Sequence, residues 1–311
     1  MKKSLLYIFA AIALAYGVRA LEYMGIRMNT RGQFEKYDRL FLQKNHYDIL
    51  IIGSSRAESH FRPDIISDST HLTVYNAGIL GATMPFIEGA LDAYLEKSDP
   101  PKYVILNMDY HMFDAPDDSI PNFPSYFPYL SNHALYEKFS AADPRFAGFK
   151  YVPFYSLPYM GSKYLDNALR GFFDRPSKYD TTFHDGYSPI PIPAVGDLDT
   201  MSIASTTISL KSTSWKCLEN IIGTCKSKNI KLIFVYSPLY FRISKSIVNE
   251  KELIAHLDSI STEAGFHSFD YHLSPPCYDK SNFTDLDHLS RHGSWLFSQQ
   301  FSHDLAQYIR H

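Results

Sequence analysis

Cysteine is scarce in this sequence, with 3 among 311 residues, and three cysteines cannot all pair within one chain. A scaffold held together by disulfides is therefore excluded. The sequence also lacks a basic run: 30 lysines and arginines stand against 33 aspartates and glutamates, for a formal net charge of -3. This balance argues against nucleic acid as the main partner. A composition that is 45% hydrophobic and 20% charged excludes wholesale disorder.

One stretch near the N-terminus is apolar enough to interact with a membrane. Lys2 and Lys3 precede an apolar run over 5–18, a pattern that leaves the N-terminus in the cytoplasm and sends the rest across. The run is shorter than the ~20 residues of a comfortable span, so a cleaved signal peptide competes with a retained anchor. No small-x-small cleavage site followed by a polar stretch is present, which favours a retained anchor over residues 1–24. A buried core helix is a third alternative, but it gives the lysines no purpose.

From residue 46 onward, short apolar runs alternate with helical stretches. Wholly apolar runs are typical of strands buried on both faces, which belong to parallel sheets. We therefore expect a doubly wound α/β domain over 46–311, a three-layer sandwich around a five-stranded parallel sheet, with ligands beyond the carboxyl ends of the strands. The expected strands are 48–53, 72–76, 103–107, 231–236 and 267–270, and the expected helices are about 84–97, 211–228, 247–264 and 291–309.

A long insertion, about 113–207, separates the third expected strand from the fourth. It is rich in proline, tyrosine, phenylalanine and aspartate, and so many aromatic residues argue against disorder. Two interpretations stay open. The insertion is either a cap or wall over the site, with aromatic rings that stack on sugars, or a packed structural excursion.

A serine-containing turn, Gly53-Ser54-Ser55-Arg56, directly follows the first expected strand. A serine there is exposed at the carboxyl end of the strand, with its own N–H near a helix N-terminus. A nucleophile needs this access and a backbone donor for the developing oxyanion. Gly-Ser turns after strands also bind phosphate or cap helices, so the turn alone does not assign a nucleophile.

A second set of candidate residues, Asp285 and His288, lies just before the last expected helix. A carboxylate three residues before a histidine can hold its Nδ1–H, which leaves Nε2 free to take a proton from a serine. The last strand-to-helix connection faces the same sheet edge as the first, so Ser55 and His288 can meet. Alternatively, Asp285 or Asp287 merely caps the final helix. A metal pair of His288 and His292 has no third ligand close in sequence, so we expect no metal.

Together these pieces resemble the SGNH hydrolase superfamily, also called GDSL-like lipases and acyl esterases. A Gly-Ser-Ser turn stands where the family has Gly-Asp-Ser, which makes Ser55 the nucleophile. The segment 76–83 looks like the second block of the family, in which Gly81 matches the glycine that lends its N–H to the oxyanion hole. Asp285-x-x-His288 matches the closing block. The resemblance implies the flavodoxin-like SGNH fold, a catalytic triad of these residues and no cofactor.

The third block departs from the family pattern. It should carry an asparagine whose side chain completes the oxyanion hole, and here Asp109 stands at roughly that place. An ionised aspartate repels an oxyanion unless it is protonated or turned aside. Asn107, two residues earlier on the same face of the strand, can substitute. The first block also has Ser54 where the family has aspartate. The expected oxyanion donors are thus Ser55, Gly81 and Asn107 (or Asp109).

The anchor and the two end blocks resemble a branch of extracytoplasmic bacterial envelope proteins, among them the alginate O-acetylation proteins and the teichoic-acid D-alanine transfer protein. This resemblance implies acyl transfer or ester hydrolysis on a glycan, at the cytoplasmic membrane, beside a polytopic membrane acyltransferase. Arg56 and His111 are candidate substrate-binding residues, although Arg56 can instead pair with Glu58 or Asp64 on the surface. A catalytically inactive SGNH-like module that binds glycan or scaffolds an export complex is the alternative.

Overall fold

The structure of the chain is a computed structural model that describes residues 2–29, 33–114, 120, 123–175, 184–190, 197–209 and 211–310. The chain divides into two compact units. The first comprises residues 1–44, 92–97 and 122–182, and the second comprises residues 45–91, 98–121 and 183–311. The insertion expected over 113–207 is thus shared between the two units. Each unit is described by itself.

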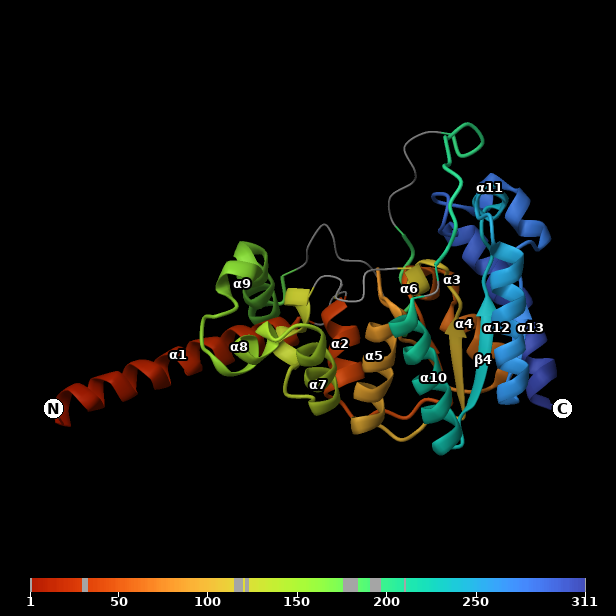
Figure 1. The fold of residues 1–311 in the computed structure, drawn as a ribbon. Helices are drawn as coiled ribbons and strands as arrows, with labels where there is room; N and C mark the ends of the chain where they lie inside the picture. The colour runs from red at the N-terminus through yellow and green to blue at the C-terminus, as the bar shows by residue number, and fades with distance from the viewer. Residues whose placement is uncertain are drawn as a thin grey trace. The chain divides into compact units, whose positions relative to one another are not determined.

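The second unit is built around a parallel sheet (Figure 1). Its strands are β1 (Ile49–Ile52), β2 (Val74–Asn76), β3 (Tyr103–Asn107), β4 (Lys231–Tyr236) and β5 (His267–Asp270). They are hydrogen-bonded in the order β2-β1-β3-β4-β5, and every pair is parallel. The chain winds outward in both directions from the boundary between β1 and β3, which is the switch point where ligands bind in such sheets. The expected five-stranded parallel sheet is confirmed.

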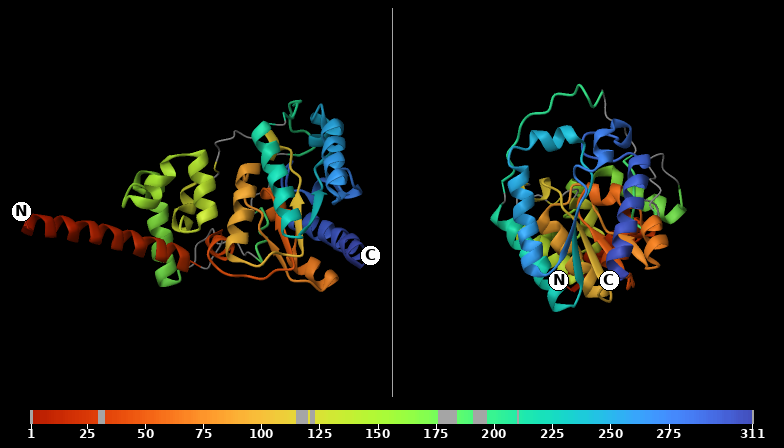
Figure 2. Two further views of the ribbon diagram at one scale, coloured as in Figure 1. Left: turned by 60° about the horizontal axis from the view of Figure 1, so that its bottom comes forward. Right: turned by 90° about the vertical axis from the view of Figure 1, so that its right-hand side faces the viewer.

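Helices cover both faces of this sheet, as the right-hand view of Figure 2 shows for α10 and α12 on one side and α13 on the other. Every residue of β1 and β3 is buried, as strands covered on both faces require. Ile49 and Ile51 face a core that contains Phe297 and Phe301 of α13. The helices that include residues of this unit are α3 (Ser55–His60), α4 (Pro63–Thr70), α5 (Met84–Lys97), α6 (His111–Asp114), α10 (Ser212–Ser227), α11 (Phe241–Ser246), α12 (Glu250–Ala264) and α13 (Arg291–Arg310), with short 3-10 helices η2 (Pro275–Tyr278) and η3 (Lys280–Asn282).

The observed helix bounds match the expected ones, with one shift. The helix expected from residue 247 begins at Glu250. The reason is that Ile247 forms a parallel bridge with Thr206 of the insertion, so the residues before Glu250 are extended or in a turn. A pairing between residues about forty positions apart thus sets the start of this helix, and the local hydrophobic periodicity does not predict it.

The first unit is helical in the part of the chain that the structure describes. Its helices are α1 (Lys2–Met28), α2 (Gln33–Phe41), η1 (Phe123–Tyr129), α7 (His133–Ala142), α8 (Arg145–Tyr151) and α9 (Leu157–Phe173). The expected anchor, 1–24, falls within α1 apart from its first residue, and α1 continues four residues beyond it. An 18-residue window of α1 has a mean hydropathy of 1.8 and is not buried, so α1 is long and apolar enough to cross a membrane or to serve as a signal sequence.

Many aromatic residues of the insertion pack against one another inside the first unit. Tyr126, Tyr129 and Phe146 are fully buried, and the rings of Phe127 and Phe149 stack at 4.2 Å between centroids. Rings buried in a core cannot stack on a sugar. The packed structural excursion therefore accounts for these residues better than a glycan-stacking cap does.

Candidate active site

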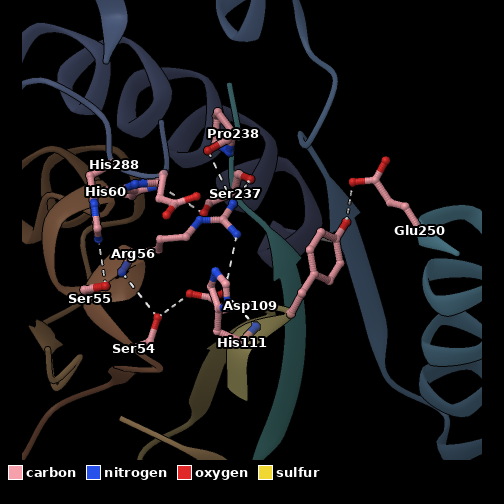
Figure 3. Close-up of polar contacts among 12 residues, drawn as sticks. Ser54, Ser55, Arg56, His60, Asp109, His111, Ser237, Pro238, Glu250 and His288 are labelled. Atoms are coloured by element: carbon pink, nitrogen blue, oxygen red, sulfur yellow. Dashed lines mark hydrogen bonds and ion pairs between the residues drawn. The ribbon is translucent and has the colours of Figure 1, made fainter. Parts of the chain in front are cut away.

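Ser55, His288 and Asp285 form a connected hydrogen-bonded series at the carboxyl edge of the sheet. Figure 3 shows the link between Ser55 and His288. Ser55 is the first residue of α3, directly after β1, and its Oγ lies 2.8 Å from His288 Nε2. His288 Nδ1 lies 2.9 Å and 3.0 Å from the two carboxylate oxygens of Asp285. The structure thus brings together the three residues that the sequence named as a triad. They come from the first and the last strand-to-helix connections.

The turn from Asp285 to His288 is fixed by the aspartate itself. Its Oδ1 accepts the backbone N–H groups of Asp287 and His288, both at 2.8 Å. Burial acts to raise the pKa of Asp285, but the hydrogen bond and charge of His288 and these backbone donors outweigh it, so its pKa is lowered. An ionised carboxylate only accepts, so Nδ1 of His288 carries the proton and Nε2 is left to accept from Ser55.

A second histidine, His60, supports the loop that carries His288. It is fully buried at the end of α3, and its Nε2 accepts the backbone N–H of Leu289 at 3.1 Å. Its Nδ1 therefore carries the proton and donates to Ser237 Oγ at 3.0 Å. Burial, and then the charges of Arg56 and His288, hold the pKa of His60 well below its ordinary value. Sequence reasoning missed this residue, since nothing distinguishes it from any histidine in a last helical turn.

The two departures from the family pattern, Ser54 and Asp109, are bonded to each other. Ser54 Oγ donates to Asp109 Oδ2 at 2.5 Å, and Asp109 Oδ1 accepts the N–H of His111 and lies 3.9 Å from Arg56 Nη1 (Figure 3). Burial acts to raise the pKa of Asp109, but Arg56 and the bond from Ser54 lower it overall. Asp109 is therefore an ionised carboxylate tied to Ser54 and Arg56.

Asn107, the alternative oxyanion donor, is fully buried at the end of β3. Neither polar atom of its side chain has a hydrogen-bond partner among the described residues. A Cβ placed on Gly53 would lie 3.2 Å from the Asn107 Cβ, so the side chain lies against the turn that leads to Ser55. An unpaired buried amide is costly, and such a group is a candidate for a ligand contact.

The second block, which includes Gly81, is fastened to α3. Asn76 donates to the carbonyls of Ala57 and Phe61 at 2.7 and 2.9 Å, and its Oδ1 accepts the N–H of Gly78 at 2.9 Å. A Cβ on Gly78 would lie 2.4 Å from the backbone N of Glu58, so the two backbones touch. Gly81 is in an exposed turn with a φ of 73°, a left-handed conformation that suits glycine. The assignment of the Gly81 N–H to the oxyanion hole remains a prediction.

Arg56 does not pair with Glu58 or Asp64 on the surface, so that alternative is wrong. The Arg56 side chain is 4% exposed and donates to the carbonyl of Ser237 at 2.6 Å, while Asp64 pairs with Arg62. The residue points inward because backbone carbonyls after β4 are available to it. Arg56 and His111, the two candidate substrate-binding residues, both line a pocket of about 180 Å³ together with Asp109 and Asp287.

The metal alternative has no support in the described part of the chain. His288 lies in the loop before α13, so it does not share a helical face with His292. The ring of His292 stacks on that of Trp295. Among the described residues, no group of three His, Cys, Asp or Glu side chains could hold a metal ion.

Comparisons with known proteins add a likeness of fold. No protein-family model matches the sequence, and no curated protein matches it. A solved structure described as a lipolytic protein of the G-D-S-L family, from Desulfitobacterium hafniense DCB-2, aligns with 82% of this chain and 98% of its own. The two chains are 11% identical and the TM-score is 0.40. A likeness at that level assigns no activity to this chain.

Proposed function

We propose that this chain is a serine-dependent acyltransferase or esterase of SGNH type that acts on a bacterial envelope glycan outside the cytoplasm. One observation carries the proposal: Ser55 Oγ, the His288 ring and the Asp285 carboxylate are joined by hydrogen bonds of 2.8 to 3.0 Å. This is the arrangement that activates a serine hydroxyl for attack on an ester.

In this mechanism Ser55 Oγ attacks the ester carbonyl while His288 Nε2 takes its proton. The Asp285 carboxylate stabilises the imidazolium that forms. The N–H groups of Ser55 and Gly81 receive the oxyanion, and the Asn107 amide is the third candidate donor. The C–O bond then breaks, and the alcohol leaves with the proton from His288. A sugar hydroxyl or water next attacks the acyl-enzyme and gives its proton to His288, which returns it to Ser55.

The location and the partner rest on α1 and on the resemblance to envelope proteins. Two lysines before an exposed apolar helix favour a single anchor with the folded part of the chain outside the cytoplasm. A glycan or acyl-ester substrate and a polytopic membrane acyltransferase that delivers the acyl group are the partners expected of such a protein.

A catalytically inactive module that binds glycan or scaffolds an export complex is the second candidate. The ionised Asp109 favours it, because this carboxylate stands in the block that should supply an oxyanion donor. Its bonds to Ser54 and Arg56 turn it aside and reduce the conflict.

Fluorophosphonate labelling of the full chain in detergent distinguishes the two functions. We expect the wild type to be labelled and Ser55→Ala and His288→Ala to remain unlabelled. Ser259→Ala, on the exposed surface of α12, is the matched control and should be labelled like the wild type. Absence of labelling in folded wild-type protein would favour the binding module.

A further inference from the structure

The pocket beside the triad has one polar end and one apolar wall. Arg56 and Asp287, which line the polar end, are the chain neighbours of Ser55 and His288. The lining also includes aliphatic side chains, here called the apolar wall, which cannot hydrogen-bond a sugar. They are Ile203, Ile208, Leu239, Ile243 and Ile247.

Hydrogen bonds fix this wall in place. The segment around Thr206 is tied to the end of α11, since the Thr206 N–H donates to the carbonyl of Ser246 at 2.9 Å and its carbonyl accepts from Val248 at 2.8 Å. The Asn249 side chain bonds both the N–H and the carbonyl of Ile208, each at 2.9 Å. The wall is therefore part of the folded structure and does not need a ligand to assemble it.

Resting on the proposed function, we propose that this pocket receives the acyl group of the ester and restricts it to a short chain. A dry cavity of about 150 Å³ holds benzene, so a pocket of similar size accepts about six carbon atoms. The ester carbonyl then lies at the polar end toward Ser55, and the alkyl chain lies against the isoleucines. A long fatty acyl chain exceeds this volume.

The test measures p-nitrophenol release during acylation for esters from acetate to dodecanoate, using the full chain in detergent. We expect butyrate and hexanoate to react at least about tenfold faster than dodecanoate. Ala204→Trp, which fills the pocket, should slow hexanoate about tenfold and leave acetate within about twofold. Ala255→Trp on the exposed surface of α12 is the matched control.

The outcomes separate the two levels of the proposal. A labelled protein whose acylation rate does not depend on chain length, or is unaffected by Ala204→Trp, overturns the pocket assignment alone. A protein that no ester acylates and no fluorophosphonate labels overturns the proposed function, and the acyl pocket with it.

A different observation concerns the first unit, where α8 and α9 expose an unusual number of large apolar side chains. Leu165, Leu169 and Phe172 recur at helical spacing on α9 and are 38 to 55% exposed, and Phe173 is 63% exposed. The segment from the last residue of α8 to the first residue of α9 adds more of them. They are Tyr151, Val152, Phe154, Tyr155 and Leu157. We call these nine side chains the α8–α9 apolar surface; large apolar side chains exposed in such number mark an interaction site.

This surface continues from α1. Gly25 and Gly171 bring the two helices into backbone contact, because a Cβ on Gly171 would lie 1.8 Å from the Gly25 carbonyl oxygen. Close packing through small residues is typical of helices in membranes. Tyr16, within the apolar run of α1, donates to the carbonyl of Tyr151 at 2.6 Å. Tyr151, at the end of α8, thus lies beside a part of α1 that itself needs an apolar surrounding.

We infer that the α8–α9 apolar surface is immersed in the membrane leaflet next to the folded part of the chain. Gly25 directly follows the expected anchor, 1–24, which places α9 near the membrane–water boundary. Tyrosine and phenylalanine are well suited to that boundary, and Arg145 and Lys150 of α8 can reach the lipid head groups. The helices α8 and α9 of the insertion then help α1 to hold the chain at the membrane.

Depth-dependent fluorescence quenching tests the inference in the full chain, reconstituted in phosphatidylglycerol–phosphatidylethanolamine nanodiscs. The three native cysteines are buried, so the single variants Leu157→Cys and Leu169→Cys can be labelled selectively with the fluorophore NBD. Leu14→Cys in α1 is the positive control, and Ala141→Cys, exposed at the end of α7, is the matched polar-side control. We expect lipids with a nitroxide on the acyl chain to quench NBD at positions 14, 157 and 169, and to leave position 141 unaffected.

Two results would overturn this inference. One is that labels at 157 and 169 are quenched as little as the label at 141. In that case, a disulfide between two unlabelled copies of the Leu169→Cys variant would show that a second copy covers the surface. The other is an unquenched label at position 14. This result would mean that α1 does not lie in the membrane, and the inference rests on α1 being there.

Discussion

The two sides of Ser55 are built in different ways. On the proton-transfer side, Asp285 and His288 stand three residues apart in one turn, and that turn is closed by the aspartate's own bonds to the backbone. On the oxyanion side, the residues come from separate segments at or beyond the ends of β1, β2 and β3. The difference shows that the proton-transfer side depends on one turn of the chain, whereas the oxyanion side depends on hydrogen bonds between separate segments, such as Ser54–Asp109.

The largest effect is expected on the proton-transfer side. Asp285→Asn should lower the acylation rate by about 10³- to 10⁴-fold, because an amide can donate to Nδ1 and stabilise the wrong tautomer of His288. The rate of fluorophosphonate labelling measures this, and Asp279→Asn, on an exposed loop, is the control. A loss of less than tenfold would show that Asp285 acts only through the backbone of its turn.

The next largest effect is expected on the oxyanion side, in the free energy of unfolding. Asp109→Ala leaves the buried Arg56 guanidinium without its carboxylate and should lower the free energy of unfolding by about 3–5 kcal/mol. Asp109→Asn keeps one acceptor oxygen for the His111 N–H, and its amide N–H can donate to Ser54 Oγ, so its loss should be clearly smaller. Urea unfolding of both variants measures the difference, and a loss of less than about 1 kcal/mol for Asp109→Asn, which removes the charge, would contradict a stabilising role for the ion pair between Asp109 and Arg56.

The smallest effect is expected for His60, which supports the loop that carries His288. Its pKa is lowered in the folded protein, so below about pH 6.5 the unfolded chain takes up a proton that the folded chain refuses. Stability from this group is therefore present above that pH and is lost as the pH falls, by up to about 1.4 kcal/mol per pH unit. Urea unfolding between pH 7 and 5 should show a shallower decline for His60→Gln than for the wild type. Parallel curves would mean that His60 titrates normally.

The sequence predicted those parts of the molecule that depend on local pattern. The five strands follow from short apolar runs, and the pairing of Asp285 with His288 follows from their spacing. The burial of Arg56 could not be predicted, because its acceptors are the carbonyls of Ser237 and Pro238, about 180 positions away. His60 was missed for the same reason, since its partners are Ser237 and Leu289.

The contact between Gly25 and Gly171 has a practical meaning for biochemical work. Ile26 is fully buried, and Gly25 meets the backbone of α9. Cutting away residues 2–28 to obtain a water-soluble protein would open a groove along Ala168 and Gly171 and remove part of a hydrophobic core. The helix that holds the chain at the membrane is also a structural element of its first unit. A truncated protein that aggregates would therefore say nothing about the chemistry of Ser55.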